Sequence, residues 1–222
     1  MEKRRNVNIY YGVALLLILI VIVFWRELVA YDTFLTEYIY NYFDNRLATE
    51  FFDFVTDYTI GSYFGLLVVL MGLLYFVKRV ELGVYGVFCV LILLANTFLK
   101  HVLLRLRPYE TIEGMQNLTT SLVMDQYSFP SSHSAFAFFI AYYLSEVLGL
   151  ETKYKWVLYF MAVMVAISRV YLGVHFVSDV VVGSIVGLIA GMIAKKVVAN
   201  IKLSNLGMVY RPDSLQLLPP LL

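Results

Sequence analysis

The stretch LGVYGVFCVLILLANTFLKHVLLRLRP, residues 82–108, decides the fold class of this chain. Its first part, Leu82–Leu99, contains no charged residue and is almost as long as the roughly 20 residues that a helix needs to cross a bilayer. Lys100 and Arg107 follow the apolar run, and the ring of Pro108 disfavours helical geometry at the residue before it. The stretch therefore predicts a membrane-spanning helix that ends at Arg107 and carries cations near its end.

Similar apolar runs recur along the chain, in which 61% of the 222 residues are hydrophobic and only 15% are charged. Soluble domains typically contain about 45–50% apolar and about 25% charged residues, so this composition favours a membrane protein. The runs predict an all-α bundle of six transmembrane helices: Ile9–Trp25, Ile60–Val77, Leu82–Leu99, Ser134–Leu150, Trp156–Val174 and Phe176–Ala194. Residues 1–203 are expected to form one membrane domain, followed by a disordered tail over residues 204–222.

Lysine and arginine residues are distributed unevenly between the two ends of these spans. Eleven of the 17 fall on the side of the N-terminus: Lys3, Arg4, Arg5, Lys78, Arg79, Lys153, Lys155, Lys195, Lys196, Lys202 and Arg211. Because cytoplasmic loops carry the excess of Lys and Arg, both termini are predicted to be cytoplasmic. The net charge of +1 gives no reason to expect a nucleic-acid partner, which calls for a basic patch.

The connection between the first two predicted spans, residues 26–59, is acidic and rich in aromatic residues. Its apolar side chains recur every three to four residues: Phe34, Tyr38, Tyr42, Phe43, Leu47, Phe51, Phe54, Val55 and Tyr58. This spacing predicts one or two amphipathic helices lying in the membrane interface. We interpret the segment first as an aromatic belt that anchors the protein, and second as a wall that guides a lipid toward the site.

Charged residues gather at one end of the last four predicted spans, and such residues in a membrane mark function by default. Lys100 and Arg107 stand two helical turns apart, so both are expected on nearly the same face of their helix. Arg105 lies between them on a different face, and we interpret it as an interface anchor rather than a ligand.

A second cluster, Pro130-Ser131-Ser132-His133, stands immediately before the fourth span. Serine at the start of a helix is an ordinary N-cap, and His133 considered alone fits an interfacial position equally well. A helix N-terminus also offers free N–H groups and the positive end of a dipole, which suit an anion such as phosphate. Both interpretations are open for this cluster taken by itself.

The third cluster contains Ser168 and Arg169 at the end of the fifth span, then His175 and Asp179. His175 and Asp179 share one helical face if the sixth span begins at or before His175, and that spacing lets a carboxylate hold an imidazole in one tautomer. With a cytoplasmic N-terminus, all three clusters lie on the extracytoplasmic side. Two histidines, three cations, the two serines of the second cluster and an aspartate therefore predict a shared anion site.

These clusters resemble, in order, the three motifs of the type-2 phosphatidic acid phosphatase (lipid phosphate phosphatase) superfamily, which shares its site with vanadium haloperoxidases. Residues 100–108 match K-x6-R-P, residues 130–133 match P-S-G-H with Ser132 in place of glycine, and residues 168–179 match S-R-x5-H-x3-D. Serine is tolerated at this position if the backbone is helical there, and it carries strain if the position needs a positive φ.

The resemblance implies a role for each matching residue. His175 is the nucleophile that forms a phosphohistidine, and Asp179 orients it. His133 is the general acid that protonates the leaving group, and then the base that activates water. The phosphate-binding residues are Lys100, Arg107, Ser131, Ser132 and Arg169. No metal or cofactor is expected, because the cations neutralise the transferring phosphoryl group.

The expected function is that of a multi-pass cell-membrane phosphatase that acts on a lipid phosphate at the extracytoplasmic face. Among the lipids that bacterial members of this size hydrolyse, undecaprenyl diphosphate is favoured, with overlapping activity on phosphatidylglycerophosphate and phosphatidate. One alternative is a lipid phosphotransferase that passes the group from the same phosphohistidine to a second lipid. The other is a channel or scaffold, but a pore would need polar residues along several spans, whereas here they occupy one rim.

Overall fold

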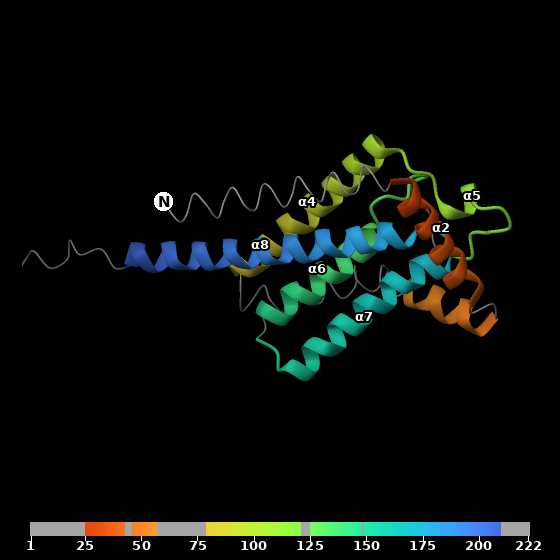
Figure 1. Cartoon of the computed structure of the whole chain (residues 1–222). Coiled ribbons are helices and arrows are strands. Elements are labelled where there is room, and N and C mark those ends of the chain that lie inside the picture. Colours follow the sequence, from red (N-terminus) through yellow and green to blue (C-terminus); the bar gives the residue numbers. More distant parts are fainter. Residues whose placement is uncertain (1–24, 43–45, 57–78, 121–124, 148, 210–222) are drawn as a thin grey trace, which may run out of the picture.

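The computed structural model describes residues 25–42, 46–56, 79–120, 125–147 and 149–209, and the regular elements of these ranges are helices (Figure 1). They are α2 (Trp25–Tyr42), a helix over 46–56, α4 (Arg79–Leu103), α5 (Pro108–Thr111), α6 (Ser132–Val147), α7 (Thr152–Tyr171) and α8 (Val177–Val209). The all-α prediction is thus confirmed for the described residues. The first two predicted spans, residues 9–25 and 60–77, lie outside these residues except for Trp25.

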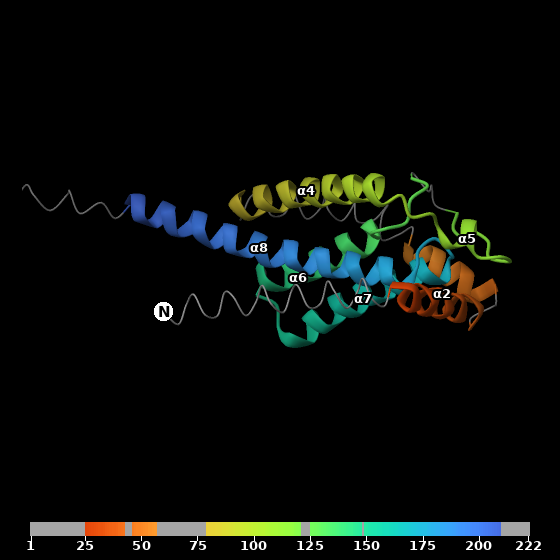
Figure 2. The ribbon, with the colours of Figure 1, turned by 45° about the horizontal axis from the view of Figure 1, so that its top comes forward.

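The helices α4, α6, α7 and α8 correspond to the last four predicted spans, and they pack side by side (Figures 1 and 2). Among the described residues, two of them, α4 and α8, are long and apolar enough to cross a membrane by length and composition. Helix α8 continues to Val209, six residues beyond the predicted end of the membrane domain at residue 203.

The predicted end of the third span is wrong by about one helical turn. Helix α4 ends at Leu103 rather than at Arg107, and Leu104 adopts a left-handed conformation with φ +49°. The Leu104 N–H still bonds the main-chain oxygen of Lys100 at 2.9 Å, which closes the last turn. Arg107 therefore lies on the segment that follows the helix, not on the helix itself.

Helices α6 and α8 approach each other closely because glycines recur every four residues along α8. A Cβ atom at Gly183 would collide with the main-chain oxygen of Ser131, and one at Gly187 with that of Ala135. Small residues at this spacing let two helix backbones approach within a membrane. The approach brings the start of α6 against the start of α8, where the Ser131 N–H donates to the main-chain oxygen of Asp179 at 3.1 Å.

Helix α2 and the helix over 46–56 lie at one end of the bundle (Figures 1 and 2). Both are amphipathic, as predicted, and expose aromatic side chains: Tyr31, Phe34, Tyr38, Tyr42, Phe51 and Phe54. Their other sides make polar contacts with the bundle. Thr56 shares a 2.7 Å hydrogen bond with Ser168, and Thr36 accepts one from the Val177 N–H at 3.2 Å. These helices therefore hold the ends of α7 and α8 that carry the third motif.

Candidate functional site

The structure brings all three predicted clusters to the same end of the bundle. Arg107 donates from Nη1 to the main-chain oxygen of Val174 at 2.8 Å, next to His175. Ser131, just before α6, bonds the main chain of Asp179 in the first turn of α8. Most predicted site residues are buried and the rest are half-buried: Lys100, Arg107, Ser131, Arg169, His175 and Asp179 in the first group, Ser132 and His133 in the second.

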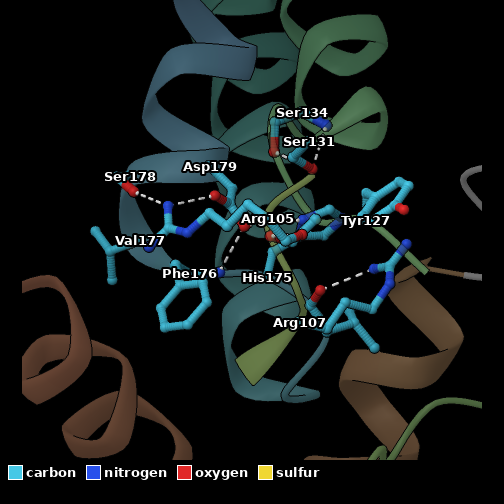
Figure 3. Close-up of polar contacts among 12 residues, drawn as sticks. Arg105, Arg107, Tyr127, Ser131, Ser134, His175, Phe176, Val177, Ser178 and Asp179 are labelled. Atoms are coloured by element: carbon cyan, nitrogen blue, oxygen red, sulfur yellow. Dashed lines mark hydrogen bonds and ion pairs between the residues drawn. The ribbon is translucent and has the colours of Figure 1, made fainter. Parts of the chain in front are cut away.

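His175 lies in the connection between α7 and α8, two residues before α8 begins. The sixth span does not begin at or before His175, so His175 and Asp179 do not share a helical face. The predicted pair forms nevertheless, because His175 Nδ1 lies 3.4 Å from Oδ2 of Asp179 (Figure 3). The same oxygen accepts the Phe176 N–H at 2.9 Å, so the carboxylate also caps the start of α8. A hydrogen on Nδ1 that faces the carboxylate leaves Nε2 as the nucleophilic ring atom.

Burial, and then the charges of cations such as Arg107 and Arg169, hold the pKa of His175 well below its ordinary value. The imidazole is therefore neutral at neutral pH, which is the form with a lone pair to donate. The main-chain oxygen of Arg169 holds this segment by accepting the N–H groups of Val174 and His175 at 3.3 and 3.2 Å. Gly173, with φ +75°, permits the turn that places them there.

Two of the predicted phosphate-binding cations are held by neutral partners. Lys100 Nζ donates to the main-chain oxygen of Tyr127 at 2.9 Å. The Arg107 guanidinium donates to the main-chain oxygens of Asp125, at 2.6 and 3.0 Å, and of Val174, at 2.8 Å. Because carbonyl oxygens orient a cation without cancelling its charge, both side chains keep their positive charge available for an anion.

His133 lies in the first turn of α6, within electrostatic range of Arg169, His175 and Lys100. Its Nε2 atom is inaccessible to solvent and has no hydrogen-bond partner among the described residues. A buried polar atom without a partner costs about 1–3 kcal/mol unless a ligand satisfies it. The position that the resemblance assigns to the general acid is therefore one that a bound ligand would complete.

Ser132, where the family motif has glycine, lies in α6 and does not have a positive φ. Among the described residues, Leu104 is the non-glycine residue with a positive φ. The helical alternative for this position is therefore the correct one. The Ser132 hydroxyl accepts a hydrogen bond of 3.3 Å from Nδ2 of Asn96, a fully buried residue one turn before Lys100. Asn96 was not among the predicted site residues, although an amide inside an apolar span is itself a signal of a polar contact.

The structure contradicts the interpretation of Arg105 as an interface anchor. Its Nη1 donates to Oδ1 of Asp179 at 2.7 Å (Figure 3), and its Nη2 donates to Oδ2 of Asp32, in α2, at 2.6 Å. The prediction assumed that Arg105 lies on the same helix as Lys100. Helix α4 ends before Arg105, so helical periodicity does not determine where this side chain points. Arg105 contacts the same carboxylate that faces His175.

The ligand that this arrangement fits is an anion. Lys100, Arg107 and Arg169 supply positive charge, whereas the carboxylate of Asp179 is already engaged by Arg105. In the ranges that the structure covers, no group of three or more His, Cys, Asp or Glu side chains is placed to hold a metal ion.

Comparison with known proteins identifies the same family as the motifs. Residues 81–202 match the PAP2 superfamily. Phosphatidylglycerophosphatase B of Bacillus subtilis (strain 168) is 40% identical over 98 residues, which cover 40% of this chain and 44% of that protein. The alignment thus spans less than half the length of this curated relative.

Two solved structures resemble this one. Aquifex aeolicus LpxE aligns with a TM-score of 0.63 at 30% identity, covering 73% of this chain and 93% of that one. The first transmembrane PAP2-type phosphatidylglycerolphosphate phosphatase from Bacillus subtilis aligns with a TM-score of 0.61 at 28% identity, covering 79% and 88%. The chain therefore belongs to the PAP2 superfamily, a family of metal-independent lipid phosphate phosphatases, and it is a membrane protein.

Proposed function

We propose that this protein is an integral membrane phosphatase that hydrolyses a lipid phosphate through a phosphohistidine at His175. The observation that carries the proposal is the buried Nε2 of His133, which lacks a partner among the described residues and lies within electrostatic range of His175 and three cations. A phosphoryl group between the two imidazoles would use that nitrogen and neutralise that charge. This geometry supports phosphoryl transfer better than a pore or scaffold, which would not need it.

In the first step, Nε2 of His175 attacks phosphorus while the bond from phosphorus to the lipid oxygen breaks. Asp179, facing Nδ1, stabilises the positive charge that the ring acquires. His133 gives its proton to the departing oxygen and then accepts one from the water that attacks the phosphohistidine, which releases phosphate. The roles of both histidines are those that the family motif implies.

The cations act on the transition state. Charge accumulates on the three equatorial oxygens of the transferring phosphoryl group, so groups fixed around those oxygens lower the barrier. Lys100 and Arg107 are fixed by main-chain carbonyls before any ligand arrives. They therefore need little reorganisation when the phosphate binds.

Phosphatidylglycerophosphate is the substrate that we propose to test first, because both Bacillus relatives are named for activity on it. This choice differs from the undecaprenyl diphosphate favoured by sequence. Purified protein should release phosphate from phosphatidylglycerophosphate in EDTA and without a second lipid acceptor. Parallel reactions use undecaprenyl diphosphate, phosphatidate and soluble phosphate esters. Release that needs added Mg²⁺, or an acceptor lipid, would contradict metal-free hydrolysis.

We also propose that the site faces the extracytoplasmic side, as the distribution of Lys and Arg predicts. Gln116 and Lys153 are both exposed. The main-chain oxygen of Gln116 lies against Gly173, beside the third cluster, whereas Lys153 lies at the start of α7, at the opposite end of that helix from Ser168 and Arg169. In a chain with Cys89 replaced by alanine, Gln116→Cys should react with a membrane-impermeant thiol reagent in intact cells, and Lys153→Cys should not. The reverse labelling would overturn this orientation.

A further inference from the structure

The carboxylate of Asp179 is fully buried and its two oxygens have different partners. Oδ2 accepts the Phe176 N–H at 2.9 Å and faces His175 Nδ1 at 3.4 Å. Oδ1 accepts Nη1 of Arg105 at 2.7 Å. The orientation of the carboxylate toward the histidine is therefore set partly from its far side, by the guanidinium.

Arg105 is itself held in one orientation. Its Nη2 donates to Oδ2 of Asp32 at 2.6 Å, and its Nη1 also donates to Oγ of Ser178 at 2.6 Å. The guanidinium lies over the ring of Phe176, 3.9 Å from the centroid. A guanidinium that donates hydrogen bonds from both terminal nitrogens and packs one face against an aromatic ring has little freedom to rotate.

Asp32 is fixed in turn by the start of α8. Its Oδ1 accepts the Ser178 N–H at 2.8 Å, and its Oδ2 accepts the Ser178 hydroxyl at 2.5 Å. The free N–H groups and positive dipole end of a helix N-terminus favour such a carboxylate. Asp32, Arg105 and Asp179 thus form a chain of charges that runs from α2 to the predicted nucleophile.

We propose that Arg105 and Asp32 are positioning residues of the site: Asp32 holds Arg105, Arg105 holds the Asp179 carboxylate, and the carboxylate holds His175 for attack. The inference rests on the proposed phosphatase function, and it makes α2 a part of the active site rather than only a membrane anchor. Neither residue touches the phosphoryl group. Their loss should therefore lower the rate of the chemical step and leave substrate binding nearly unchanged.

The test measures kcat and KM for phosphate release in four variants, each normalised to the number of sites that bind vanadate at saturation. Arg105→Ala should lower kcat by about 10- to 100-fold, by analogy with residues that orient metal-binding side chains, with KM within about twofold. Arg105→Lys should lower it less, because one ammonium cannot hold both carboxylates as a fork does. Asp32→Asn should have the smallest effect, and the double variant Asp32→Asn/Arg105→Ala should be no slower than Arg105→Ala alone.

The matched control is Arg46→Ala, which removes an exposed arginine paired with Glu50 at 2.8 Å and should leave kcat unchanged. Unchanged kcat per vanadate site in Arg105→Ala, or additive losses in the double variant, would overturn the inference. If Arg105→Ala does not fold, Arg105→Lys and Asp32→Asn are compared with the unmodified protein instead. An unchanged kcat per vanadate site in both variants would overturn the inference. Failure of the unmodified protein to release any phosphate would instead overturn the proposed function, and the inference with it.

Discussion

Two networks of carboxylates and cations stand at opposite ends of α6, and they differ in burial. Near the end of α6, Glu146 pairs with Lys155 of α7 at 3.0 Å and with Lys195 of α8, and the three side chains are 25%, 34% and 50% exposed. Beside its start, Asp179 pairs with Arg105, and the side chains are 0% and 26% exposed. The first network joins α6, α7 and α8, and the second joins α2 to α8 through Arg105, so both networks link helices of the bundle.

Burial decides what each network can do. An exposed ion pair contributes about 0–1 kcal/mol, and water solvates either partner when the other is removed. A buried carboxylate that loses its cation has no such compensation and must move or take up a proton. The network around Glu146 therefore fastens the helices α6, α7 and α8, whereas the network around Asp179 also fixes the orientation of a side chain that the family motif assigns to catalysis.

The largest effect is expected at the two histidines of the buried end. His175→Ala should form no phosphoenzyme with any substrate, because the nucleophile is missing. His133→Ala keeps the nucleophile but loses the proton donor, worth roughly 10²–10⁴-fold with a lipid alkoxide. With p-nitrophenyl phosphate, whose leaving group needs little protonation, His133→Ala should retain some phosphorylation and accumulate phosphoenzyme.

Acid-labile phosphoenzyme is measured by rapid quenching with radiolabelled substrate. The outcome that reverses the two roles is phosphoenzyme in His175→Ala together with its absence in His133→Ala. Loss of phosphate release alone would not separate them, since both variants are expected to turn over poorly.

The next effect compares the two carboxylates directly. Asp179→Asn keeps the shape of the side chain but removes the charge that stabilises a positive imidazole, and it should lower kcat by about 10³–10⁴-fold. Glu146→Gln makes the same chemical change at the exposed end and should leave kcat within about twofold. Steady-state phosphate release checks both. Equal losses in the two variants would mean that burial does not separate the networks by function.

Much of the site was predictable because each motif lies within a short stretch at a helix end. Lys100, His133 and His175 are informative by residue type, since ionisable groups at the rim of apolar spans are costly unless they are used. Gly183 and Gly187 recur at the spacing that permits close helix packing, but this spacing does not identify α6 as the partner helix.

The role of Arg105 could not be predicted from the motif that contains it. Its orientation depends on the end of α4 at Leu103, and Leu104 is not a residue that ordinarily marks a left-handed turn. Its partner Asp32 lies 73 residues away, in a segment whose pattern reports only amphipathicity. Tertiary pairing at that distance is decided by packing, which no local spacing encodes.

The pH dependence of phosphoenzyme formation should reflect the environment of His175. Since the pKa of His175 is held below its ordinary value, the neutral nucleophile persists as the pH falls below about 6.5. The acidic limb of phosphoenzyme formation should therefore lie below that pH. Arg107→Gln removes one of the charges that lower this pKa, so the acidic limb should move toward higher pH. The substitution should also lower the rate itself, because Arg107 is a proposed phosphate-binding residue. Initial rates between about pH 4.5 and 8 test this, and a limb that stays or moves lower contradicts it.

The smallest expected effect concerns stability and its response to salt. Glu146→Gln should lower the free energy of unfolding by about 1 kcal/mol or less, because its partners Lys155 and Lys195 are partly exposed. Salt screens exposed charges much more than buried ones, so about 1 M salt should remove most of the difference from the unmodified protein. Asp32→Asn, whose partner network is mostly buried, should be destabilised by a similar amount at low and high salt. Thermal unfolding of the detergent-solubilised proteins at two salt concentrations measures both. If salt changes the stability of the two variants equally, then exposure does not distinguish the two networks. The conclusion that the Glu146 network only joins helices, whereas the Asp179 network orients a catalytic side chain, would then be wrong.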